Sequence, residues 1–115
     1  VARLYRRFDA DAVVAEINQG GDMVEAVLRT AEPTLPVKKV RATRGKWLRA
    51  EPVAALYEQG RVVHAGHFPA LEDQMCDFGP DGLSSGASPD RLDALVWALT
   101  ELVLARRGEP QIRML

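Results

Sequence analysis

The chain has 115 residues, and its 15 basic and 16 acidic residues give a formal net charge of −1. This size allows one domain with a substantial hydrophobic core. Because the overall charge is near neutral, any contact with nucleic acid has to come from a local basic patch. The single cysteine, Cys76, excludes an intrachain disulfide and favours an intracellular compartment. No apolar run approaches the ~20 residues of a membrane span, and no signal peptide is recognisable.

A helix pattern and then a short apolar run open the chain. Apolar residues at helical spacing predict a helix over residues 1–8. Because the chain starts at Val1 without Met and inside this pattern, we expect a fragment whose first helix has lost its start. Residues 12–17 have the length and apolar character of a buried strand. Glu16 lies near the end of that strand, and the glycine-containing residues 18–21 after it allow close approach of backbone.

A second helix and a second strand are expected next. Asp22 is the predicted N-cap of the helix, Glu25 occupies the capping-box position, and Pro33 marks the end. Residues 35–42 alternate loosely between apolar and basic side chains, which predicts a strand with one solvent-facing side. The order strand, helix, strand favours parallel pairing through a right-handed crossover.

The middle of the chain predicts a third helix followed by a third strand. Residues 47–57 carry the helical pattern, in which Pro52 marks either a kink or the first turn. Gly60 is the expected stop of this helix. The apolar segment 61–64 then predicts a third short strand.

Before the last helix, the sequence predicts a short helix and a loop. Apolar residues over 69–78 predict the helix, and Cys76 is expected to be a buried thiol on it. Residues 79–87 are rich in Gly, Ser and Pro, which predicts a flexible loop.

The last helix pattern, over residues 88–107, carries an unusual pair of acids. Ser88 is a favourable N-cap, and Pro89 suits the first helical position. Asp90 and Asp93 are three residues apart, so both face one side of the first turn. One acid near a helix start is explained by the helix dipole, but two on such an apolar helix need a second explanation.

Strands separated by helices predict an α/β layered fold with a parallel sheet of two or three strands. Ligands of such folds bind at the carboxyl ends of the strands, where Glu16 is expected. A final helix packed on the sheet would bring Asp90 and Asp93 beside Glu16. Three converging carboxylates repel one another unless cations lie between them, and all-oxygen sites suit Mg²⁺ or Mn²⁺.

Four stretches of the sequence resemble the C-terminal nuclease domain of terminase large subunits, the DNA-packaging motor proteins of tailed phages, prophages and gene-transfer agents. They are Val13–Gly21, Gly45–Val53, Gly60–His64 and Ser88–Leu95. The resemblance covers roughly residues 1 to 105. It implies an RNase H-like three-layer fold and cleavage of concatemeric DNA with two divalent metal ions.

Carried over by position, the resemblance implies catalytic and metal-binding roles for three acids. Glu16 matches the family's second acid, and Asp93, with Asp90 one turn earlier, matches the acidic helix that completes the site. The family's first acid lies on a strand that would precede Val1. The resemblance therefore implies a domain truncated at its N-terminus, and we expect weak metal binding and poor cleavage by these residues alone.

Basic residues are densest between the predicted second strand and third helix. They are Lys38, Lys39, Arg41, Arg44, Lys46 and Arg49. Such a run is either a solvated face or a DNA contact, and we expect Arg44, Lys46 and Arg49 to lead any contact with phosphates. Trp47 is expected in the core rather than stacked on a base. His64 and His67, with Cys76, lack zinc-site spacing, so we expect ordinary surface or core packing.

Two alternative functions stay open. One is a non-catalytic α/β module that binds DNA or a packaging partner, and the other is a Holliday-junction-resolvase-like nuclease. The sequence has no phosphate-binding loop of an ATPase, so the resemblance implies that the motor domain lies elsewhere in a full-length protein. The expected partners are double-stranded DNA, that ATPase domain, the portal and the small terminase subunit, without a membrane. The expected location is the cytoplasm of a bacterial host, and an exposed sheet edge would favour a homodimer.

Overall fold

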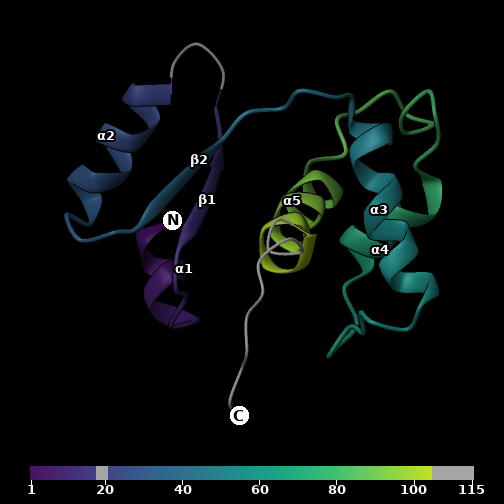
Figure 1. The fold of residues 1–115 in the computed structure, drawn as a ribbon, viewed down its shortest axis with the longest axis horizontal. Coiled ribbons are helices and arrows are strands. Elements are labelled where there is room, and N and C mark those ends of the chain that lie inside the picture. Colours follow the sequence, from purple (N-terminus) through teal and green to yellow (C-terminus); the bar gives the residue numbers. More distant parts are fainter. Residues whose placement is uncertain (18–20, 105–115) are drawn as a thin grey trace. The chain divides into compact units, whose positions relative to one another are not determined.

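The computed structural model describes residues 1–17 and 21–104 of the chain. These residues belong to two compact units, Val1–Thr43 and Arg44–Leu115, and each unit is described by itself. Figure 1 shows the first unit in purple and blue and the second in teal, green and yellow.

The first unit contains two helices and a parallel two-stranded sheet (Figure 1). Its elements are α1 (Ala2–Arg7), β1 (Val13–Glu16), α2 (Gly21–Ala31) and β2 (Val37–Val40). The register pairs Val13 with Val37 at one end and Glu16 with Val40 at the other. Helix α2 connects the two strands, so the predicted strand–helix–strand order and parallel pairing are confirmed.

Burial of Leu35 and a few ion pairs hold the first unit together. Leu35, at the start of the predicted second strand, is only 1% exposed. Glu25 of α2 forms the predicted pair with Arg29, at 3.4 Å, and a second pair with Lys39 of β2, at 3.5 Å. Because α2 starts at Gly21, Asp22 lies inside the helix, and its predicted place as N-cap is wrong.

Over its described residues, 44–104, the second unit is a group of three helices extended by a π-helical turn. Its elements are α3 (Lys46–Glu58), α4 (Pro69–Asp77), α5 (Asp90–Leu99) and η1 (Thr100–Leu104). The buried side chains of Val53 on α3 and of Leu92 and Val96 on α5 form the core. Leu92 and Val96 are four residues apart on one face of α5 and pack against Val53 of α3. This packing explains why the apolar stripes in the sequence predicted where α3 and α5 lie along the chain.

Two predictions in the second unit are wrong. Residues 61–64 are not a strand, because among residues 44–104 no neighbouring strand offers them a partner, and Val63 points into solvent. Cys76 is exposed on α4 rather than buried. The predicted last helix, in contrast, is confirmed from Asp90 to Leu99 and continues as the π-helical turn to Leu104, and residues 105–107 lie outside the described part.

Residues 79–87 contain tight turns rather than helix or strand. Gly79 and Gly82 exchange backbone hydrogen bonds, and the Ser84 amide and hydroxyl both donate to Asp77 Oδ2. Gly82 and Gly86 have φ of 94° and 80°, a conformation that favours glycine. In the described ranges 1–17 and 21–104, no helix has the length and apolar character needed to cross a membrane.

Candidate metal centre and nucleic-acid interface

Glu16 is exposed at the carboxyl end of β1, as the sequence predicts. It lies opposite Val40 in the sheet register, and the next amide, of Ile17, donates to the Val40 carbonyl at 2.8 Å. Both parallel strands therefore end at this edge. Residues 18–20, for which close backbone approach was expected, lie outside the described residues.

Asp90 and Asp93 both lie in the first turn of α5. Asp90 is exposed, whereas the Asp93 side chain is only 12% exposed. Ser88 does not cap the helix as predicted, because its hydroxyl donates to Asp90 Oδ1 at 2.6 Å. Instead, Pro89 occupies the N-cap position and its carbonyl accepts a hydrogen bond from the Asp93 amide.

Two cations from the first turn of α3 contact Asp93. Arg49 Nη2 donates to Asp93 Oδ1 at 2.8 Å, and both side chains are almost buried. The guanidinium lies 4.6 Å from the centre of the Trp97 ring, and its Nε donates to the Arg44 carbonyl at 3.2 Å. Lys46 Nζ lies 3.7 Å from Asp93 Oδ2. The Asp93 carboxylate of α5 is thus held against α3 by two positively charged side chains.

Lys46 also connects the two acids of α5. Its Nζ donates to Ser88 Oγ at 3.2 Å, and Ser88 donates in turn to Asp90 Oδ1. The network therefore runs from Asp90 through Ser88 and Lys46 to Asp93 and Arg49, all within the second unit. Sequence reasoning placed the acids together correctly on one helix start, but it did not pair them with Lys46 and Arg49.

Asp90, Asp93 and Ser88 offer only carboxylate and hydroxyl oxygens, the ligands that suit a hard divalent cation. A positive charge already lies beside one of these carboxylates, since Lys46 Nζ is 3.7 Å from Asp93 Oδ2. Glu16 belongs to the first unit and the α5 acids belong to the second. Among residues 1–17 and 21–104, no group of three or more His, Cys, Asp or Glu side chains is close enough to hold a metal ion.

The start of α3 has the properties of a phosphate-binding helix end. Gly45 is its N-cap and provides no side-chain hydrogen bond to the first-turn amides, and no acid lies in that turn. Arg44 is exposed beside it, Lys46 is half-buried, and Arg49 is almost buried. Of the three predicted DNA contacts, Arg44 and Lys46 are therefore the accessible ones, and Arg49 is committed to Asp93.

Sequence reasoning missed a hydrogen-bonded chain of Tyr57, His64 and Glu72. Glu72 Oε2 lies 2.6 Å from His64 Nδ1, and the Tyr57 hydroxyl lies 2.8 Å from His64 Nε2. Because a carboxylate only accepts, His64 Nδ1 donates to Glu72, and in the tautomer with that single N–H the Nε2 atom accepts from the Tyr57 hydroxyl. The hydrogen bond from His64 lowers the pKa of Glu72, and burial, followed by the nearby Glu72 charge, raises the pKa of Tyr57. The seven-residue spacing of Tyr57 and His64 across the Gly60 turn is a weak signal for this chain.

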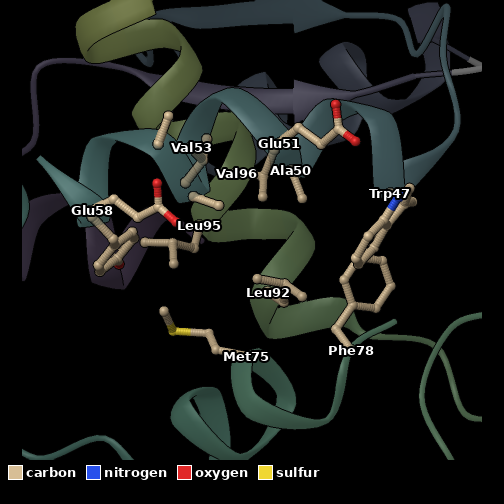
Figure 2. A pocket seen from close by; sticks show the side chains of 13 residues that line it. Trp47, Ala50, Glu51, Val53, Glu58, Met75, Phe78, Leu92, Leu95 and Val96 are labelled. Atoms are coloured by element: carbon tan, nitrogen blue, oxygen red, sulfur yellow. The ribbon is translucent and has the colours of Figure 1, made fainter. Parts of the chain in front are cut away.

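An apolar cavity of about 420 Å³ lies between α3, α4 and α5. Figure 2 shows Met75 from α4 and Leu92 from α5 among the side chains that line it, and the paired rings of Trp47 and Phe78 at one side. Those rings are 5.6 Å apart, so Trp47 packs on Phe78 while staying 38% exposed. Glu51 contributes one of the few polar side chains of the lining.

The model of the terminase RNaseH-like domain family matches residues 1–102. The chain belongs to this family. Membership confirms the predicted relationship to the C-terminal nuclease domain of terminase large subunits and the predicted RNase H-like α/β class. Neither the curated proteins nor the solved structures contain a significant match to this terminase domain.

Proposed function

We propose that this terminase domain is a metal-dependent endonuclease that hydrolyses phosphodiester bonds of concatemeric DNA during packaging. The family match over residues 1–102 carries the proposal. The acidic start of α5 and the basic start of α3 support it, because they put metal-binding and phosphate-binding chemistry side by side in one unit.

Glu16, Asp90 and Asp93 are the proposed ligands of Mg²⁺ or Mn²⁺, with two ions in the active site. Bound there, the ions would activate a water and stabilise the leaving oxygen. Arg49 keeps the Asp93 carboxylate in one orientation through the 2.8 Å hydrogen bond. Ser88 orients Asp90 in the same way. Both are the kind of supporting contact that fixes a metal ligand before the ion arrives.

Arg44 and Lys46 are the proposed contacts to the DNA backbone. Their charges and the uncapped amides of α3 attract phosphates without reading base sequence, so low sequence specificity follows. In the full-length protein the proposed partners are the ATPase motor, the portal and the small subunit, in the cytoplasm of a bacterial host.

A non-catalytic module that binds DNA or a packaging partner is the second candidate. The observation in its favour is that Asp93 is almost buried between two cations, as a purely structural acid would be. A junction resolvase has similar acids, but the family match favours a terminase.

Nicking of supercoiled plasmid in Mn²⁺ tests the proposal against the second candidate. Glu16→Gln and Asp90→Asn each change an exposed acid, so both variants should fold. We expect the unmodified chain to nick slowly, and each variant to lower that slow rate more than about 100-fold, the upper range for residues that only orient a metal ligand. Asp81→Asn, at an exposed acid of the 79–87 turns, is the matched control and should nick like the unmodified chain. Equal nicking by all three variants would rule out the proposed site.

A further inference from the structure

The two cations that contact Asp93 are held very differently. The Arg49 guanidinium is 11% exposed, is hydrogen-bonded to Asp93 at 2.8 Å and lies over Trp97. The Lys46 side chain is 40% exposed, and its 3.7 Å distance to Asp93 Oδ2 is too long for a hydrogen bond. Arg49 is therefore fixed in place, whereas Lys46 can leave Asp93 at little cost.

The position of Lys46 is also unfavourable for its own helix. Lys46 is the first residue of α3, where the helix dipole disfavours a positive side chain. Its Nζ lies among oxygens instead, 3.2 Å from Ser88 Oγ and near Asp93 Oδ2. Ser88 connects this ammonium to Asp90. Lys46 thus occupies the oxygen-rich place that the proposed function gives to a divalent cation.

We propose that Lys46 is a displaceable internal counter-ion, which leaves Asp93 for a DNA phosphate and so couples DNA binding to divalent-cation binding. The inference rests on the proposed function. An ammonium and a divalent ion beside the same carboxylate oxygen repel each other, so Lys46 weakens metal binding while it stays there. A duplex phosphate at the uncapped start of α3, next to Arg44, gives the ammonium another partner.

The coupling is reciprocal, because each ligand favours the same arrangement of Lys46. DNA draws the ammonium away from Asp93 and raises the affinity for the metal ion, and the metal ion must raise the affinity for DNA by the same factor. The exposed Lys46–Asp93 ion pair sets the size of this coupling. Exposed ion pairs are weak, so losing this one should change the metal-binding constant roughly two- to fivefold. The metal site would then fill at a roughly two- to fivefold lower ion concentration where DNA is present.

Binding of Mn²⁺ to the full chain, followed by electron paramagnetic resonance with and without a short DNA duplex, tests this coupling. Mn²⁺ bound by the duplex alone is subtracted. Without DNA, Lys46→Gln should bind Mn²⁺ roughly two- to fivefold more tightly than the unmodified chain. With DNA, the unmodified chain should gain roughly the same factor, and Lys46→Gln should gain less.

Arg61→Gln is the matched control, since it removes one positive charge just beyond the other end of α3. The thirteen residues of α3 separate the two sites by about 20 Å, so this variant should leave Mn²⁺ binding unchanged. Lys46→Met repeats the test with a side chain that keeps the apolar stem. If Asp90→Asn weakens Mn²⁺ binding but Lys46→Gln and Lys46→Met do not change it, the counter-ion inference is wrong and the proposed function stands. If Asp90→Asn has no effect either, both are wrong.

Discussion

Removing the Arg49 guanidinium should destabilise the helical unit strongly. In Arg49→Met the aliphatic stem stays over Trp97, while the charge that faces Asp93 is lost. The two side chains are 11% and 12% exposed, so Asp93 would keep a charge with little access to water. The perturbation therefore tests whether this ion pair, rather than apolar packing alone, fixes α5 against α3.

The expected loss can be bounded from the geometry. Breaking a buried ion pair by removing one partner costs about 3–5 kcal/mol. Lys46 remains 3.7 Å from Asp93 Oδ2 and the site is not fully buried, so about 2–3 kcal/mol is expected here. For a domain of this size the melting temperature should fall by roughly 10–20 °C.

Urea unfolding followed by tryptophan fluorescence measures this loss, because Trp47 and Trp97 both belong to the second unit. Arg61→Met makes the same substitution at an exposed residue of that unit and should change the free energy of unfolding by less than about 0.5 kcal/mol. A loss below about 1 kcal/mol in Arg49→Met is the range of surface ion pairs and would refute the reasoning.

Three further predictions concern the remaining titratable and reactive groups of the second unit. The His64 hydrogen bond lowers the pKa of Glu72. The ionised Glu72 carboxylate therefore stabilises the fold above the ordinary pKa of 4.5, and this stabilisation is lost as the pH falls through the lowered pKa. The urea midpoint should therefore drop in acid, and Glu72→Gln should flatten that drop; an equal drop in both would contradict this role. Since burial raises the pKa of Tyr57, its phenolate absorbance should appear above the ordinary pKa of 10.0, and its contribution to stability should persist below 10.0 and vanish as the pH rises through the raised value. Tyr57→Phe should remove this late absorbance step, and persistence of the step in the variant would contradict its assignment to Tyr57. Exposed Cys76 should react with a disulfide reagent in the folded chain, whereas reaction only after denaturation would contradict the exposure seen here.

Local patterns predicted most elements of this fold. The apolar run before Glu16 and the helix after it were enough to predict a parallel pair, because a crossover through a helix permits little else. The segment 61–64 failed, since strand propensity depends on a neighbouring strand that the sequence cannot supply. The predicted cap at Ser88 failed for a related reason: its hydroxyl finds a nearer acceptor in Asp90.

The candidate site was predictable in its acids but not in its counter-ions. Spacing alone placed Asp90 and Asp93 on one face of a helix start. Arg49 is 44 residues from Asp93 in sequence, and no local pattern indicates that pair. The sequence predicts the basic run to be either a solvated face or a DNA contact, whereas the packing of α3 on α5 turns Arg49 of that run inward onto Asp93.

Paramagnetic broadening of amide resonances by Mn²⁺ tests the proposed metal site most directly. We predict that substoichiometric Mn²⁺ broadens the amides around Glu16 and those from Asp90 to Asp93 together. Asp90→Asn should weaken the broadening of both sets, because the proposed function assigns both acids to one metal centre. Broadening of only one set, or of exposed acids throughout the chain, would contradict a metal site formed by Glu16 and the α5 acids.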